Sequence, residues 1–192
     1  MIHNEIVVVE DEKKQVVLTW LGEESGESKW TIVLEGDRSE IDVYGVFYGT
    51  EAWKKACNVS VIHKGKDTRA NVFACGVVVD SSSLDFSGLL RVEHGAKRTR
   101  TFFRANLMIL SAQASAFTFP GLEIEENDIA QGGHAATVGK VNEEQMFYLM
   151  SRGLDGDESR KLVIKGFFEP VLKLIDQDVQ ENIRERLGVL LD

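Results

Sequence analysis

Short strand-like runs fill the first 124 residues, and this pattern constrains the fold more than any other feature of the sequence. Valine, isoleucine, phenylalanine and threonine dominate the runs, polar residues separate them, and no helical periodicity interrupts them. The runs are 6–9, 16–20, 30–34, 41–48, 58–63, 71–79, 84–92, 101–110 and 117–124. Many short strands at roughly regular spacing predict a sandwich, a barrel or a stacked solenoid.

The breaks between the runs favour the solenoid among these three folds. The Asn-Gly and Asp-Gly pairs that mark tight hairpins are absent from this half of the sequence. Runs such as 77–79 and 107–110 are continuously apolar, as expected for buried parallel strands. We therefore expect a mainly β protein, with a parallel β-helix over residues 1–140 and a small helical subdomain over 141–192. No repeat of fixed period is visible, so this expectation rests on strand pattern alone.

The periodicity of the C-terminal part is helical. Asn142 is expected to cap a first helix, which Gly153 should end. Asp157 should open a second helix, and Pro170 should kink or split it because proline lacks a backbone donor. A third helix is expected over 177–190, where apolar residues recur along one side.

Charge and composition narrow the function. The chain has 22 basic and 31 acidic side chains and a net charge of −9, which argues against nucleic-acid binding. One local basic cluster stands out: Arg91, Lys97, Arg98, Arg100 and Arg104. It has two interpretations, a solvated turn or strand face, and a contact for an acidic partner or a second subunit.

Motifs for catalysis or protein-only metal binding are absent from the sequence. There is no His-x-x-x-His, Cys-x-x-Cys, Gly-x-Ser-x-Gly or phosphate-binding loop, so no catalytic residues are expected. A polysaccharide-cleaving β-helix would need clustered acids or calcium ligands on stacked strands, which the β-rich part lacks. Cys57 and Cys75 are too few for a disulfide framework, and no signal peptide or bilayer-spanning run is apparent. We expect a cytoplasmic protein with reduced thiols that is not an enzyme.

Two segments around residues 133–153 resemble the SufB/SufD family of iron–sulfur cluster assembly proteins. They read Gly133-His-Ala-Ala-Thr-Val-Gly139 and Glu143-Glu-Gln-Met-Phe-Tyr-Leu-Met-Ser-Arg-Gly153. Supporting segments are Val61-Ile-His-Lys64, Thr118-Phe-Pro-Gly-Leu-Glu123 and Lys165-Gly-Phe-Phe168, and the similarity spans roughly residues 58–172. The resemblance implies a right-handed parallel β-helix with a helical tail, and a scaffold that holds a nascent cluster.

The resemblance also implies a partner, a SufC-type ABC ATPase that docks on the helical tail. Gln145, Tyr148, Arg152 and Phe168 would form the docking face or support it. An alternative for the tail aromatics is core packing between helices, and Phe147 and Phe167 in particular fit that alternative. A homodimer, or pairing with a SufB/SufD-type subunit, is the expected assembly.

Two positions differ from the SufB pattern that the resemblance implies. Ala114 stands where SufB-type chains carry a cysteine, and Ala135 where they carry a glutamate after the histidine. His134 is the candidate ligand that remains; its alternative is a buried histidine between the β body and the helices. No firmly bound cofactor is expected, only a transient iron–sulfur cluster or iron. The alternative function is a metal-free interaction module that binds the ATPase or itself.

Overall fold

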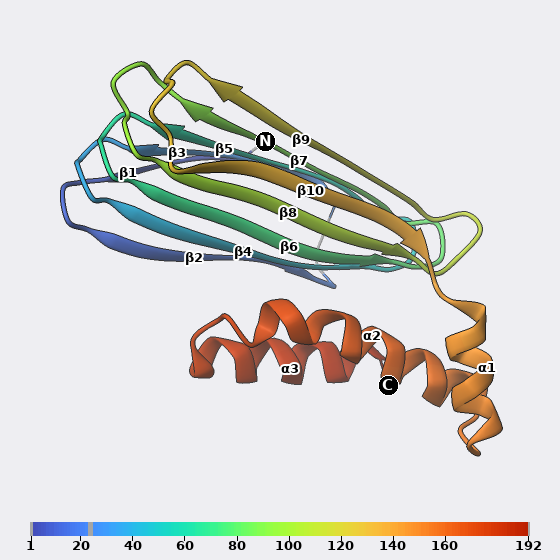
Figure 1. The fold of residues 1–192 in the computed structure, drawn as a ribbon. Coiled ribbons are helices and arrows are strands. Elements are labelled where there is room, and N and C mark those ends of the chain that lie inside the picture. Colours follow the sequence, from blue (N-terminus) through green and yellow to red (C-terminus); the bar gives the residue numbers. More distant parts are fainter. Residues whose placement is uncertain (1, 23–24, 192) are drawn as a thin grey trace.

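The computed structural model describes residues 2–22 and 25–191, and in that part of the chain ten strands precede three helices (Figure 1). The strands are β1 (Ile2–Val8), β2 (Lys13–Leu21), β3 (Gly26–Leu34), β4 (Glu40–Gly49), β5 (Lys54–His63), β6 (Arg69–Val78), β7 (Ser83–Val92), β8 (Arg100–Ile109), β9 (Ser115–Ile124) and β10 (Gln131–Lys140). The helices are α1 (Glu143–Ser151), α2 (Gly156–Leu172) and α3 (Gln177–Leu191).

The strands form a parallel β-helix, which confirms the fold expected from the sequence. Odd-numbered strands make one sheet in the order β1-β3-β5-β7-β9, and even-numbered strands make the other in the order β10-β8-β6-β4-β2. The strand pairs in both sheets are parallel, each strand pairing with the strand one coil away. Figure 1 shows the two sheets stacked face to face, with the helices outside them.

The coils differ in length, and this explains why the sequence shows no fixed repeat. Lys13, Glu40, Arg69, Arg100 and Gln131 stand in one register line across the even-numbered sheet. The steps between them are 27, 29, 31 and 31 residues. The corners differ in length by two or four residues between coils. The sequence therefore has no fixed period, although the strands stay in register.

An apolar core fills the space between the sheets. Three stacked phenylalanines lie at its centre, with ring centroids 5.2 Å apart for Phe47 and Phe86 and 5.5 Å apart for Phe86 and Phe103. Burying such large side chains is the main source of stability for a fold of this kind, at about 25 cal/mol per Å² of apolar surface. The interior is therefore a packed core rather than a channel.

His63 is the largest of the fully buried polar side chains in the described part of the chain. It stands in an inward-facing register column between Leu34 and Val92 and is fully buried. Its Nδ1 lies 2.8 Å from the Thr68 hydroxyl, and among the described atoms Nε2 has no hydrogen-bond partner. Desolvation lowers the pKa of His63 from 6.5 to about 4, because burial disfavours the charged imidazolium.

Corners at one end of the coils repeat a single backbone device. Asp11, Arg38, Asp67 and Arg98 all adopt left-handed backbone conformations, with φ between 56° and 60°. Arg38 donates to Asp11, and Arg98 donates to Asp67 on the neighbouring coil. These ion pairs join corners that are one coil apart and help to offset the local cost of the left-handed conformation.

Helices α2 and α3 cover the outer face of strands β2, β4 and β6. A second apolar cluster lies between them and contains strand residues such as Val46 and Val77 together with Ile164, Phe168 and Leu187 of the helices. The strands under these helices are therefore buried on both faces, which accounts for the continuously apolar runs in the sequence. In contrast, no described helix covers the outer face of the odd-numbered sheet (Figure 1).

Three details differ from the sequence-based expectations. The run Gln131–Lys140 is strand β10, although its glycines and alanines gave no strand signal. Helix α2 is capped by Asp155 rather than Asp157, through a capping box with Glu158. Pro170 does not split α2, because it lies in the last turn and the helix ends two residues later at Leu172.

Candidate functional site

Helix α1 presents an exposed face that contains three of the four residues expected to bind a partner. Gln145, Tyr148 and Arg152 follow each other at helical spacings of three and four, so they share one side of the helix. The Arg152 guanidinium carbon lies 5.1 Å from the centre of the Tyr148 ring, and Tyr148 is 56% exposed. In the described part of the chain, α1 has no fully buried residue; Met146 and Leu149 pack against the apolar cluster, while Gln145, Tyr148 and Arg152 are exposed and available for contact.

A groove between α1 and α2 adjoins this face. It has a volume of 420 Å³, and its lining includes Gln145, Leu149, Leu162 and Phe167 together with Met108 of β8. Apolar side chains beside an aromatic–arginine pair are typical of protein contact sites. Core packing was the alternative expected for Phe147 and Phe167. Phe147 is 74% exposed and does not fit it, whereas Phe167 is half-buried against the apolar cluster and also lines the groove.

Phe168 has a different place from the other three expected contact residues. It is fully buried in the apolar cluster between α2 and the even-numbered sheet, and its ring meets that of Phe167 edge-on at 6.0 Å. A side chain without exposed surface cannot contact a partner, so Phe168 belongs to the support of the docking face. Its contribution is to hold α2, and with it the wall of the groove, on the β-helix.

His134 lies at the open end of the β-helix. It pairs in register with Phe103, which continues an inward-facing column from Val43 and Val72. Because β10 is the last strand of its sheet, no further coil covers this position and the imidazole is exposed. The alternative of a histidine buried between the β body and the helices is therefore wrong.

The residues that depart from the SufB pattern lie near this end of the molecule. Ala114 is in the corner before β9 and is largely buried, whereas Ala135 is exposed on β10 beside His134. Cys57 and Cys75 are both buried, and burial raises the pKa of both thiols, that of Cys75 to about 12. A neutral buried thiol is a poor metal ligand, since the thiolate is the form that binds.

Across the residues that the structure describes, no three His, Cys, Asp or Glu side chains gather into a group that could hold a metal ion. His134 is the exposed candidate ligand at the open end. One imidazole supplies one coordination position, while an iron–sulfur cluster needs several. Among the described residues, His134 by itself therefore does not supply a complete ligand set for a cluster.

The open end also exposes strand edges and apolar side chains. Strands β9 and β10 each have a neighbour on one side only within the described sheets. Phe117 and Phe119 of β9 are 56% and 64% exposed, and Val138 of β10 is also exposed. Free strand edges next to exposed aromatic rings are features of an association surface. The sequence analysis did not identify these residues. Two phenylalanines two residues apart on a strand face the same side of the sheet, and this spacing could have indicated an apolar surface.

The four arginines of the basic cluster fall into two groups. Arg91 is paired with Glu123 and Glu125, and Arg98 is paired with Asp67. These two therefore fit the interpretation of a solvated, locally neutralised face. Arg100 and Arg104 lie on the outer face of β8, and neither forms an ion pair with the described residues.

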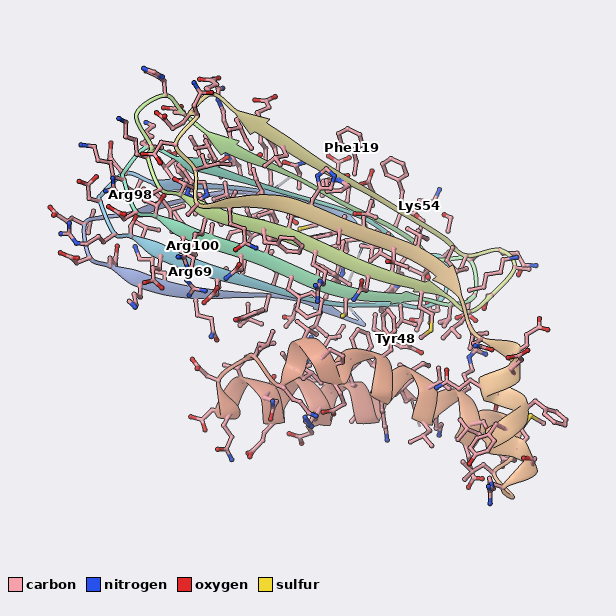
Figure 2. All side chains as sticks on the ribbon, viewed as in Figure 1. Tyr48, Lys54, Arg69, Arg98, Arg100 and Phe119 are labelled. Carbon is pink, nitrogen blue, oxygen red and sulfur yellow. The ribbon has the colours of Figure 1, made fainter. Side chains whose placement is uncertain are left out.

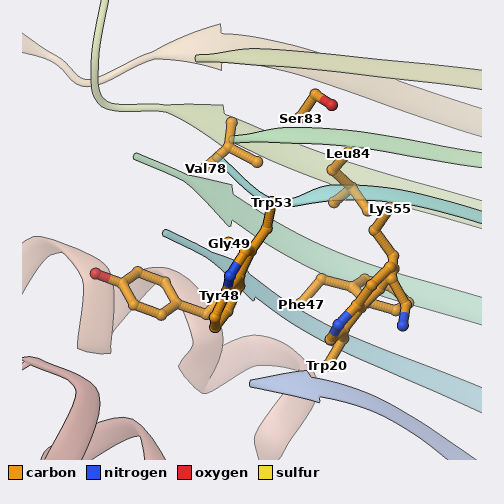
Figure 3. A pocket seen from close by; sticks show the side chains of 9 residues that line it. All are labelled: Trp20, Phe47, Tyr48, Gly49, Trp53, Lys55, Val78, Ser83 and Leu84. Carbon is orange, nitrogen blue, oxygen red and sulfur yellow. The ribbon is translucent and has the colours of Figure 1, made fainter. Parts of the chain in front are cut away.

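A small, partly open pocket lies where β4 turns into β5 (Figure 3). Trp20, Trp53, Tyr48 and Lys55 are among its lining residues, and the Lys55 ammonium group sits over the Trp20 ring. Its volume is 20 Å³, about the space of one water molecule. This cavity is a packing feature and does not offer room for a ligand.

The family described as "SUF system FeS cluster assembly, SufBD core domain" matches residues 1–167. The chain belongs to the SufBD family. It is 37% identical over 145 residues, 76% of its length, to the iron–sulfur cluster assembly protein SufD of Bacillus subtilis. It is 33% identical over 150 residues, 78% of its length, to a SufBD family protein of Pyrococcus horikoshii. The resemblance seen in the sequence is thereby confirmed.

This SufBD chain spans only part of these relatives. The matched segments cover 33% of the Bacillus and Pyrococcus proteins and 16% of a SufBD family protein of Mycobacterium leprae, which is 31% identical over 140 residues, 73% of this chain. None of the described helices is long and apolar enough to cross a membrane. The match covers the β-helix, α1 and most of α2, and so includes the open end, His134 and the α1 face.

Proposed function

We propose that this chain is a cytoplasmic scaffold component of iron–sulfur cluster assembly that acts with a SufC-type ABC ATPase. The observation that carries the proposal is the α1 face, an exposed aromatic–arginine pair beside an apolar groove, in a chain of the SufBD family. Tyrosine and arginine are the residues that most often dominate binding energy at protein interfaces. The ATPase would bind the side of α1 that carries Gln145, Tyr148 and Arg152.

A second subunit is the other part of the proposal. The free edges of β9 and β10 and the exposed rings of Phe117 and Phe119 would be covered by another copy or by a SufB/SufD-type subunit. His134 would then face the partner subunit, which could add the ligands that this chain lacks. In this arrangement iron or a transient cluster is cargo held between subunits.

The alternative is a metal-free interaction module that binds the ATPase or itself. Ala114 and Ala135 in place of the expected ligands, and the burial of both cysteines, favour it. The two functions differ in one observable, because only the scaffold retains iron. The ATPase contact is common to both.

Substitutions on α1 test the ATPase contact. We expect Tyr148→Ser combined with Arg152→Ala to weaken binding of a SufC-type ATPase by about 100-fold, since loss of two interface anchors typically costs several kcal/mol. Isothermal titration calorimetry would measure the dissociation constants. Deletion of the helical tail is a poorer test, because α2 and α3 cover an apolar face of the sheet.

Phe147→Ser is the matched control for these substitutions. Phe147 is more exposed than Tyr148, but at 3.6 residues per turn it projects about 100° away from Tyr148 and about 140° away from Arg152 around the axis of α1. We expect its loss to change ATPase affinity less than threefold. Unchanged affinity in the double variant, or an equal loss in the control, would contradict docking on the Tyr148–Arg152 side.

His134→Ala tests the cargo site. Because the imidazole is exposed and on an edge strand, the substitution should change the free energy of unfolding by less than about 0.5 kcal/mol. Iron retained after anaerobic reconstitution and desalting should fall by more than half. Retention that does not change would exclude His134 as a ligand. A large loss of stability would instead show that the residue is structural.

A further inference from the structure

Arg100 and Arg104 distinguish β8 from the other strands of the β-helix. The remaining arginines of the β body are all ion-paired: Arg38 with Glu10 and Asp11, Arg69 with Glu40 and Asp42, Arg91 with Glu123 and Glu125, and Arg98 with Asp67. Among the described residues, Arg100 and Arg104 have no carboxylate partner. In a chain of net charge −9, two exposed and unpaired guanidinium groups on one strand are an exception.

The side chain of Arg104 is held in place by two aromatic rings. Its guanidinium carbon lies 5.6 Å from the ring centre of Phe73 on β6 and 5.6 Å from that of Phe102 on β8. Both distances are within the range of a cation–π contact. The rings are half-buried while Arg104 is exposed, so the guanidinium is positioned without being covered. An arginine restrained in this way loses little side-chain entropy when it binds.

The surface beside Arg104 is flat. Apart from Gln131, which pairs in register with Arg100, the outward-facing residues of β10 next to β8 are small: Gly133, Ala135, Thr137 and Gly139. Part of the Phe102 ring lies where a side chain on Gly133 would project, since a Cβ there would come within 3.0 Å of the ring. The result is a shelf along β8 and β10, with Arg100 and Arg104 on one side and the free edge of β10 on the other.

Figure 2 shows Arg69 and Arg100 on neighbouring strands of the even-numbered sheet, near the end away from α1. Arg69 is already engaged by Glu40 and Asp42, so it does not compete for an incoming anion. Further along β8, Met108 lines the groove between α1 and α2. The shelf therefore runs from the unpaired arginines to the α1–α2 groove.

We propose that this shelf binds an acidic, extended segment of a partner protein, with one carboxylate on Arg100 and another on Arg104. The two arginines are four residues apart on one strand, so they project to the same side and are about 13 Å apart. Glutamates four residues apart in an extended segment have the same spacing and also share a side. Arginine pairs with carboxylates through two parallel hydrogen bonds, and the aromatic rings favour apolar side chains between the acids.

A polyanion such as a nucleic acid fits this surface less well. Two free arginines on an otherwise acidic protein neutralise too few phosphates for stable binding. The chemistry instead matches a segment with a few carboxylates at a fixed spacing. The arginines that carry this site are on β8, whereas the ATPase contact is on α1, so the inference goes beyond the proposed function even though the shelf ends at the groove beside α1.

A dye-labelled octapeptide of threonine and valine with glutamates at positions 2 and 6 is a suitable probe for the full chain. Fluorescence anisotropy should show saturable binding that weakens with salt. A second peptide with glutamates at positions 2 and 5 has the same charge, but in an extended chain its acids face opposite sides. We expect it to bind at least tenfold more weakly. Equal binding of the two peptides would overturn the proposed spacing.

Variants of the protein locate the binding surface. Arg100→Gln combined with Arg104→Gln should weaken binding of the first peptide by about tenfold or more, because arginine anchors dominate such contacts. Lys54→Gln removes a positive charge from the opposite sheet and should change affinity less than twofold (Figure 2). Absence of binding, an equal loss in Lys54→Gln, or efficient displacement of the peptide by an oligothymidylate would each refute an acidic-segment site.

Discussion

Replacing Phe168 by alanine is expected to lower the free energy of unfolding by about 4 kcal/mol, the largest effect of a single substitution predicted for this chain. The side chain is fully buried between α2 and the even-numbered sheet. Truncation would remove its buried surface and leave a cavity that the surrounding strands cannot close. Urea-induced unfolding followed by circular dichroism would measure the change.

Phe147→Ala is the matched control for Phe168→Ala. It deletes the same atoms from a ring that is 74% exposed, so the expected change is within about 0.5 kcal/mol. The comparison tests whether the helical tail is packed on the β-helix as an integral layer. Equal stability of the two variants would show that α2 does not rest on the sheet through Phe168.

Lowering the pH from 7 to 5 is expected to destabilise the protein by about 2 kcal/mol through His63 alone. The pKa of His63 is about 4 in the folded chain and 6.5 ordinarily, so between these values the unfolded chain binds more protons. Stability is then fully present above pH 6.5 and falls as the pH decreases toward 4. Urea unfolding at a series of pH values would give the slope.

His63→Asn isolates this effect from other titrations. Asparagine can keep a polar atom near the Thr68 hydroxyl but does not titrate, so the slope between pH 7 and pH 5 should decrease. Hydrogen bonds from Arg38 and Arg98 lower the pKa of Asp11 and Asp67, and backbone N–H groups lower that of Glu126. Those carboxylates lose their contribution at lower pH, below their ordinary values of 3.8 to 4.5. An identical slope in the variant would contradict the assignment to His63.

Strand composition, the absence of hairpin pairs and the continuously apolar runs together predicted the architecture, and the exposure of β10 at the sheet edge explains why this strand was missed. The nine β-rich runs all fall in strands because most of them pack in the core, where β-branched and aromatic residues are selected by burial. Strand β10 is exposed on both faces, so its sequence carries no alternation or apolar run.

The contact residues and ion pairs could be predicted only in part. The family resemblance indicated Gln145, Tyr148, Arg152 and Phe168 as contact residues or their support, but it could not show that Phe168 faces inward. The partners of the arginines lie about one coil away, 27 residues for Arg38 and Asp11 and 31 for Arg98 and Asp67. Because coil lengths vary, no fixed sequence separation identifies these ion pairs. That Arg100 and Arg104 on β8 have no carboxylate partner among the described residues became visible only in three dimensions.

The scaffold function is tested most directly by iron content in the complex with the ATPase. The chain and a SufC-type ATPase would be mixed with iron and sulfide without oxygen and separated by size-exclusion chromatography, with iron measured in the peak that contains both proteins. We expect a stable complex whose iron exceeds that of either protein alone and falls in the His134→Ala variant. A complex that forms without retaining iron would contradict the scaffold function and favour the metal-free interaction module.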